Sequence, residues 1–385
     1  MTILRRKSSN CLWFVLAIAF ASVANGFSLQ QLASRRMQLC KTKHATTTNV
    51  LSAAAVIEDS TAATRYDDQL GPMASALTKI GMMSFITSMC IALPVTLFPL
   101  WALYKMKLLS RVKKEQYALK VGQFCSRWLM RLIPFCNVKV TAPPLESSPE
   151  PSIWACNHVS ALDIFILLAN DLKARGKKKR PIKIVYWKQL EDNPVTKLLF
   201  TQCGFIPVEM TANAAGESND YDMKSFKLLL KEAKKAFTEG FDVGILPEGQ
   251  LNPTPEQGLL PCFSGAFTLA KMSKRPIRFM ALQGTHRLWH ATQGMNCTGR
   301  NMQVRVYDEG RKYKTADEFL ATFEAVVGEF GTHGQEVKNL SAWLDGSHWK
   351  QLQQQKTEEE RAVKQKEEIK TAIGAADETS SNDKA

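Results

Sequence analysis

Short apolar runs that alternate with helical patterns over about residues 150–335 constrain the fold of this chain most. Five runs have the composition of buried strands: 152–156, 182–187, 241–246, 276–283 and 302–307. Segments with apolar residues at helical spacing lie between them, for example Met223–Phe237, which Gly240 closes. Strands that alternate with helices predict an α/β domain.

Residues 1–57 differ from this body and form a predicted targeting leader. They hold seven Lys and Arg residues and no Asp or Glu. The apolar run Cys11–Ala21 is too short to span a bilayer, and small residues follow it before Phe27. The next thirty residues are basic and rich in Ser and Thr. A signal peptide followed by a transit-like stretch resembles the bipartite plastid address of algae with complex plastids. We therefore expect a plastid membrane location, with simple entry to the secretory pathway and an endoplasmic reticulum membrane as the alternative.

A second apolar segment predicts attachment to a membrane. Ile80–Tyr104 contains 25 residues without a charge, enough to cross a hydrocarbon core. Pro94 and Pro99 would kink a helix there, so either one membrane-embedded helix or a helical hairpin fits. The basic amphipathic region 105–140 suits a helix on anionic lipid, although a solvated linker helix has the same pattern.

These observations divide the chain into four parts. They are the targeting leader 1–57, a membrane-anchoring helical region 58–140, the α/β domain with its flanks, 141–345, and a polar tail 346–385. The end of the tail is rich in Gln, Glu and Lys and is expected to be a solvated helix or disordered.

The nine cysteines are scattered, without a C-x-x-C pair or a clustered Cys/His spacing. This pattern predicts buried free thiols and neither a disulfide framework nor a metal site.

The stretch "ACNHVSALDIF" (155–165) places a histidine and an aspartate between two apolar runs. In a continuous helix, side chains five residues apart would point roughly 140° apart. His158 and Asp163 can therefore meet only if His158 lies in the loop before the helix, with Ser160 as its N-cap and Asp163 in the first turn. The carboxylate would then hold one imidazole nitrogen and leave the other as a general base. The alternative is a purely structural capping box, Ser160-x-x-Asp163.

A second cluster follows the strand 241–246. In "GILPEGQLNP" (244–253), Glu248-Gly249 places a carboxylate beside unhindered backbone amides, which suits a phosphate or a ligand carbonyl. A simple turn with a solvated glutamate would have the same sequence.

Together these blocks resemble the glycerolipid acyltransferase family that includes 1-acyl-glycerol-3-phosphate acyltransferases. The family signature NHxSxxD matches Asn157 to Asp163 at every fixed position, and Leu246-Pro247-Glu248-Gly249 matches its Phe-Pro-Glu-Gly block. The remaining matches are Lys188, Pro194 and Gly204 in "KQLEDNPVTKLLFTQCGFIPV", Phe263-Ser264-Gly265-Ala266, and Arg275-Pro276-Ile277. The resemblance covers roughly residues 110–290.

The resemblance implies a mixed sheet flanked by helices and an acyl transfer without metal or cofactor. His158, oriented by Asp163, would take the proton of an acceptor hydroxyl, which then attacks the thioester of acyl-CoA or acyl-acyl-carrier protein. The implied acceptor is lysophosphatidic acid, and the product is phosphatidic acid. Membrane phospholipids are expected partners and nucleic acid is not. The implied substrate-binding residues are Asn157, Ser160, Lys188, Gly204, Glu248, Gly249 and Arg275.

Two departures from the family pattern concern the acceptor phosphate. The family's arginine six residues after the middle glycine is Met210 here, and Gln250-Leu251 replaces the arginine after Glu-Gly. A bidentate guanidinium is hard to replace. The basic residues that could serve instead are Lys188, Lys271, Arg275, His286 and Arg287. Another lysophospholipid or glycerol 3-phosphate therefore remains an alternative acceptor, and a catalytically silent lipid-binding protein is the alternative outside enzymes.

Overall fold

The computed structural model describes residues 68–144, 150–209, 223–307, 310–362 and 365. The predicted leader and Met210 lie outside them. The chain divides into two compact units, one ending at Glu336 and one beginning at Val337.

The centre of the first unit is a seven-stranded sheet in the order β1-β7-β6-β2-β5-β3-β4. Its strands are β1 Asn137–Thr141, β2 Ile153–Cys156, β3 Ile182–Trp187, β4 Ile206–Val208, β5 Asp242–Ile245, β6 Ile277–Gln283 and β7 Asn301–Val306. All neighbouring pairs are parallel except β6 and β7, which are antiparallel. The mixed sheet expected for the α/β domain is therefore confirmed.

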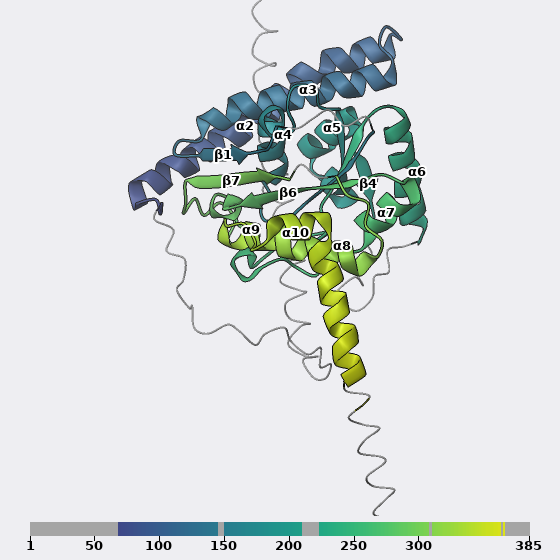
Figure 1. Cartoon of the computed structure of the whole chain (residues 1–385). Coiled ribbons are helices and arrows are strands. Elements are labelled where there is room, and N and C mark those ends of the chain that lie inside the picture. The colour runs from purple at the N-terminus through teal and green to yellow at the C-terminus, as the bar shows by residue number, and fades with distance from the viewer. Residues whose placement is uncertain (1–67, 145–149, 210–222, 308–309, 363–364, 366–385) are drawn as a thin grey trace, which may run out of the picture. The chain divides into compact units, whose positions relative to one another are not determined.

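Helices cover this sheet on both sides. Those of the first unit that follow β2 are α4 Asp163–Arg175, α5 Pro194–Cys203, α6 Met223–Thr238, α7 Gly265–Ser273, α8 Ala316–Phe323 and α9 Glu329–His333. In the view of Figure 1, α4 and α5 lie above the sheet and α7, α8 and α9 below it. The predicted start of α5 is confirmed, because the side chain of Asn193 accepts hydrogen bonds from the amides of Val195 and Thr196.

The uncharged segment belongs to one continuous helix, α2 Pro72–Lys105, which contains both Pro94 and Pro99. The chain turns back only after its end, into α3 Arg111–Leu129. The Lys114 Nζ lies 5.4 Å from the ring of Tyr104, and the Thr78 hydroxyl donates to the Pro134 carbonyl at 3.3 Å. The two helices are therefore antiparallel, and the alternative of a hairpin within 80–104 is wrong.

One side of α2 is buried and the other is exposed. Its residues at helical spacing, Met82, Phe85, Met89, Leu93 and Leu97, are at most 3% exposed. On the other side the large apolar residues include Ile91, Val95, Phe98 and Trp101, which are 41–65% exposed. The helix is long and apolar enough to cross a membrane, and 39% of its most apolar window is buried in the protein.

The region 105–140 is not helical throughout. Its last residues form the edge strand β1, which pairs in parallel with β7. The strand "NVKVT" alternates exposed and half-buried residues, the period expected for an edge strand. The seven cysteines in the described residues are all free, as expected. In the second unit, α10 Leu340–Asp345 and residues 347–362 are helical.

Candidate active site

The site residues follow three neighbouring strands at the same edge of the sheet. β2 lies between β5 and β6, and both pair with it in parallel. His158 follows β2, Glu248 follows β5 and Thr285 follows β6. The carboxyl ends of parallel strands are where α/β sheets place ligand sites, because loops converge there.

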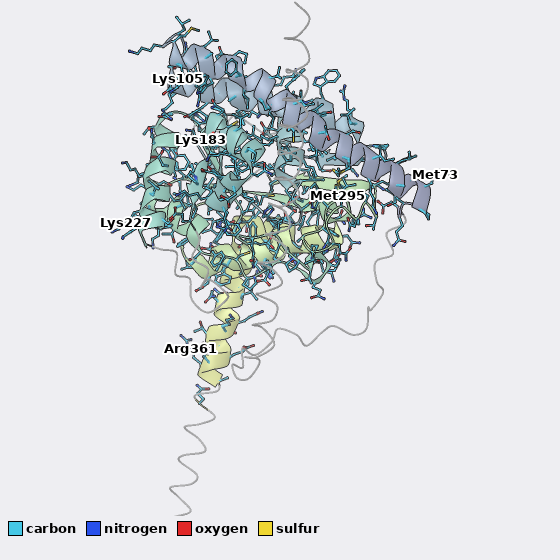
Figure 2. The ribbon with its side chains drawn as sticks, turned by 180° about the vertical axis from the view of Figure 1, so that it is seen from behind. Met73, Lys105, Lys183, Lys227, Met295 and Arg361 are labelled. Carbon is cyan, nitrogen blue, oxygen red and sulfur yellow. The ribbon has the colours of Figure 1, made fainter. Side chains whose placement is uncertain are left out.

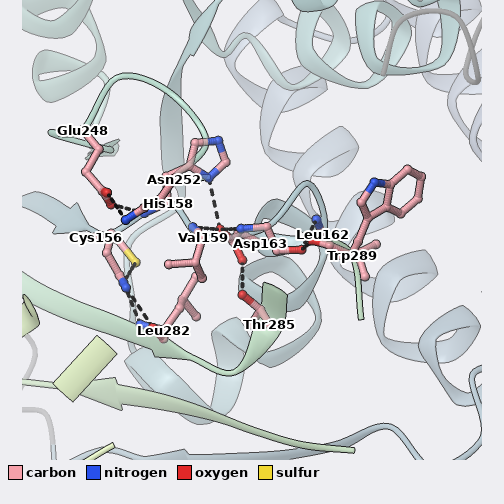
Figure 3. A network of polar contacts seen from close by, with 12 residues as sticks. Cys156, His158, Val159, Leu162, Asp163, Glu248, Asn252, Leu282, Thr285 and Trp289 are labelled. Carbon is pink, nitrogen blue, oxygen red and sulfur yellow. Dashed lines mark hydrogen bonds and ion pairs between the residues drawn. The ribbon is translucent and has the colours of Figure 1, made fainter. Parts of the chain in front are cut away.

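His158 and Asp163 meet as the sequence predicted. The imidazole Nδ1 lies 3.0 Å from Asp163 Oδ2 across the turn between β2 and α4 (Figure 3). The histidine side chain is 21% exposed and that of the aspartate 1%. The second ring nitrogen, Nε2, has no hydrogen-bond partner among the described residues, so it is available to accept a proton.

The Asp163 carboxylate is held from four directions. Besides the imidazole, Oδ2 accepts the amides of Val159 and Ser160, each at 2.8 Å. The hydroxyl of Thr285 donates to Oδ1 at 2.7 Å from the end of β6. These contacts fix the orientation of the carboxylate, and its position then fixes the imidazole ring.

The prediction that Ser160 caps α4 is wrong. The helix begins at Asp163 without a side-chain cap bond from Leu162. The Ser160 hydroxyl instead donates to the carbonyl of Trp289 at 2.8 Å and accepts the Leu162 amide at 3.2 Å. It therefore joins the start of α4 to the loop after β6.

Glu248 is buried behind the dyad, 1% exposed. Its Oε1 accepts the amide of His158 at 2.6 Å, and its Oε2 accepts the Leu260 amide at 3.0 Å and the Asn252 side chain at 3.2 Å. Burial raises the pKa of Glu248 to about 7. The carboxylate therefore holds the backbone at His158. The Gly249 amide donates to the Leu246 carbonyl at 3.0 Å, as in a turn.

Asn157 ties the end of β2 to the end of β6. Its side-chain amide donates to the Leu282 carbonyl at 2.8 Å and accepts the Leu282 amide at 2.7 Å, and the residue is fully buried. This two-way bond aligns the strands that supply His158 and Thr285.

Two other predicted site residues lie at the opposite end of the strands. Gly204 ends α5 in a left-handed conformation, before β4 begins. Arg275 precedes β6 and pairs with Glu150 at 3.2 Å. Because these strands are parallel to β2, both positions are at the amino-terminal edge, away from His158.

The basic residues considered for the acceptor phosphate also divide between the two ends of the strands. Lys271, in the last turn of α7 before β6, lies toward the amino-terminal edge with Arg275. Arg287 lies at the carboxyl ends of the strands, here called the site edge, but forms a buried pair with Asp68. Lys188 follows β3 at the site edge, is 53% exposed and pairs with Glu209. His286 is buried, with Glu256 Oε1 3.2 Å from its Nε2.

The sequence interpretation missed Thr285, Asn252 and the amide of Leu260. The strand predicted at 276–283 ends just before Thr285, so the rule for carboxyl ends could have found this residue. Asn252 and Leu260 carry no such signal, since the loop after β5 brings them back to Glu248.

Comparison with known proteins identifies the domain that holds the site. A search of curated proteins gives no match. Among solved structures, the 1-acyl-sn-glycerophosphate (LPA) acyltransferase PlsC of Thermotoga maritima is similar, with a TM-score of 0.49 and 16% identity over 68% of this chain and 96% of that one. This likeness is too distant to indicate a substrate. Residues 137–282 match the model of the acyltransferase family. They include the matched motif blocks, His158 with Asp163, and Glu248. The resemblance seen in the sequence is thereby confirmed for this part of the chain: residues 137–282 form a domain of the acyltransferase family.

Proposed function

We propose that this protein transfers an acyl chain from acyl-CoA or acyl-acyl-carrier protein to the sn-2 hydroxyl of 1-acyl-glycerol-3-phosphate, which gives phosphatidic acid. The observation that carries the proposal is the His158–Asp163 pair, 3.0 Å apart, inside an acyltransferase-family domain. Lipid binding alone would not require a partly exposed imidazole held by a buried carboxylate.

The chemistry follows from the geometry of this pair. Asp163 accepts the Nδ1 proton, so Nε2 carries the free electron pair. As the acceptor oxygen attacks the thioester carbonyl, Nε2 takes the hydroxyl proton. The carbon–sulfur bond then breaks, and the imidazolium returns the proton to the leaving thiolate. Both half-steps use one nitrogen, and no acyl group is attached to the enzyme.

For the acceptor phosphate we propose Lys188. Of the basic residues considered, it is the one that lies at the site edge with its side chain exposed to solvent. Its partner Glu209 is also exposed, at 60%. A phosphate could replace this carboxylate at small cost because exposed ion pairs are weak. If Lys188 does not bind phosphate, another lysophospholipid or glycerol 3-phosphate becomes the better candidate acceptor.

We propose that the protein works at a membrane, in a plastid or alternatively in the endoplasmic reticulum. The exposed sides of α2 and α3 carry aromatic pairs: Phe98 is stacked with Trp101, and Phe124 is tilted against Trp128 at a centroid distance of 5.9 Å. Arg131 lies 4.1 Å above the Trp128 ring and Lys105 lies 5.9 Å from the Trp101 ring. Aromatic residues beside cations are typical of the lipid–water interface.

A product assay with the full chain in detergent tests the proposal. Acyl-CoA and acyl-acyl-carrier protein are each offered with lysophosphatidic acid, other lysophospholipids and glycerol 3-phosphate. We expect phosphatidic acid as the main product, and a rate lower by roughly 100- to 10,000-fold in His158→Ala, the usual effect of losing one general base. Near-normal turnover by His158→Ala would refute the mechanism. No turnover with any pair, together with binding to phospholipid vesicles, would favour the lipid-binding alternative.

A further inference from the structure

An aspartate just ahead of α2 is bound to the loop that holds the dyad. Asp68 accepts two hydrogen bonds from Arg287, at 2.5 Å from Nη1 and 2.9 Å from Nη2. It also accepts the amide of Asn301 at 2.8 Å. The two side chains are 9% and 8% exposed, so the pair is buried. A buried bidentate pair fixes both partners tightly, and neither can lose the other without leaving a buried charge.

The surroundings are built closely around this pair. A Cβ at Gly299 would lie 2.5 Å from Arg287 Cζ. Gly284, at a φ of +79°, would place a Cβ 2.8 Å from the Asn301 carbonyl. The chain just after Asp68 is also docked, because the Leu70 amide donates to the Thr298 carbonyl at 2.9 Å. The guanidinium therefore has little space in which to move.

Arg287 belongs to the same short turn as Thr285. This turn, η4, covers Thr285–Arg287 directly after β6. Thr285 donates to Asp163 Oδ1 at 2.7 Å, and Asp163 holds His158 at 3.0 Å. Only His286 therefore lies between Arg287, whose guanidinium is held by Asp68, and Thr285, whose hydroxyl holds the Asp163 carboxylate. A shift of η4 would change that hydroxyl's position directly.

We propose that Asp68 is a positioning residue for the acyl transfer: through Arg287 and Thr285 it sets the Asp163 carboxylate, and so the imidazole of His158. The role of Asp68 in catalysis rests on the function proposed above, whereas its effect on the geometry of His158 and Asp163 does not. Asp68 lies outside the family-matched domain, in the segment that leads into α2. The dyad thus depends on how the chain ahead of the apolar helix is docked.

The kinetic test compares full-chain variants. Asp68→Asn should lower kcat by about 10- to 100-fold, the effect expected of a small misplacement of a reacting group, and leave both substrate KM values within about threefold. Asp68→Glu, which keeps the charge, should recover most of kcat. In a protein that already carries Thr285→Val, adding Asp68→Asn should lower kcat little further, since both changes act on the Asp163 carboxylate. The matched control is Glu318→Gln, which breaks a buried pair with Arg311 away from the site and should leave kcat unchanged.

A second readout does not depend on the reaction. The chain has six histidines, and loss of one signal in His158→Ala assigns its Nδ1 proton in an NMR spectrum of protein with labelled histidine. We expect this signal to shift in Asp68→Asn and in Thr285→Val but not in Glu318→Gln. An unshifted signal in folded Asp68→Asn overturns the inference, even if no acyl transfer is found. If Asp68→Asn does not fold, Arg287→Lys, which keeps the charge but loses the second hydrogen bond, gives the same decision.

Discussion

At the scale of single residues, the candidate site combines one partly exposed imidazole with buried carboxylates that hold it. His158 is partly accessible, whereas Asp163 and Glu248 are each about 1% exposed. Asp163 holds the ring of the histidine and Glu248 holds its backbone amide. Two carboxylates in different surroundings therefore have different tasks, and burial raises the pKa of Glu248.

The stability of the protein should fall between pH 5 and pH 8 because of Glu248. Burial raises its folded pKa to about 7, whereas the unfolded value is about 4.5. In this range the folded state binds more protons than the unfolded state, so stability decreases as pH rises. Glu248→Gln removes the titration, so the free energy of unfolding of the variant relative to wild type should rise by roughly 2 to 3 kcal/mol from pH 5 to pH 8.

Chemical unfolding of both proteins at the two pH values measures this difference. Any effect of the amide in Glu248→Gln on stability that does not depend on pH cancels when the differences at pH 5 and pH 8 are compared. A difference that is the same at pH 5 and pH 8 would mean that Glu248 titrates normally.

Lys188 should affect the acceptor and not the donor. If it binds the phosphate, Lys188→Ala should raise the KM for lysophosphatidic acid by roughly tenfold, the effect of one charged hydrogen bond, with the donor KM unchanged. Restoring the family's arginine with Met210→Arg in this background should recover part of the loss. Steady-state kinetics with both substrates varied gives the two KM values. An unchanged acceptor KM, with equal use of an acceptor whose phosphate carries a head group, would indicate a lysophospholipid acyltransferase of broader specificity.

At the scale of elements, the five strands of the predicted α/β pattern all occur, because their apolar runs are buried in the centre of the sheet. β1 and β4 were not predicted. Both are short strands at the two edges of the sheet: β1 pairs with β7, which lies far along the chain, and β4 has three residues that pair with β3. The dyad was predictable because it spans one turn. The contacts from Thr285 and Asn252 were not, since loop paths cannot be read from periodicity.

Gly204 has a structural task that the resemblance could not reveal. At its φ of +66°, an added Cβ would lie 2.4 Å from Glu115 Cδ, whose buried carboxylate binds Lys183 at 2.7 Å. Gly204→Ala should therefore lower the free energy of unfolding by about 3 kcal/mol, since it adds backbone strain and disturbs a buried ion pair.

Thermal unfolding in detergent checks this value against Gly240→Ala. That glycine also has a positive φ, +82°, but the nearest atom to an added Cβ is 3.8 Å away. The control should lose only about 1 kcal/mol. Equal losses in the two variants would show that the contact with Glu115 does not matter.

At the scale of the whole molecule, the first unit joins a catalytic sheet to a two-helix apolar surface. One side of α2 packs on the protein, so lipid can surround only the other side. We therefore expect the exposed side of α2 and α3 to enter the membrane while the buried side stays on the domain. In Figure 2 the ends of this helix, at Met73 and Lys105, lie at opposite sides of the unit, so the contact surface is long.

Replacing two exposed aromatic residues should convert tight membrane binding into binding that salt can reverse. In Phe98→Glu/Trp101→Glu, the apolar contribution falls and mainly the attraction of basic residues to anionic lipid remains, which salt screens. Wild type should need detergent for extraction, and the variant should be released by high salt. Leu228→Glu, at an apolar residue 50% exposed on α6, is the control and should behave like wild type. Release of wild type by salt alone would show that α2 is not embedded.

The way in which β6 completes the site has a consequence for synthesis on the ribosome. His158 and Asp163 are five residues apart and emerge together, but Thr285 follows Asp163 by 122 residues. Asn157 likewise waits for Leu282, 125 residues later. During translation the nascent chain therefore contains His158 and Asp163 before Glu248 and Thr285, which bind the His158 amide and the Asp163 carboxylate, have been made. If the proposed function holds, we therefore expect an unfinished chain that reaches a membrane through α2 to be inactive in acyl transfer until β6 and the turn after it have been added.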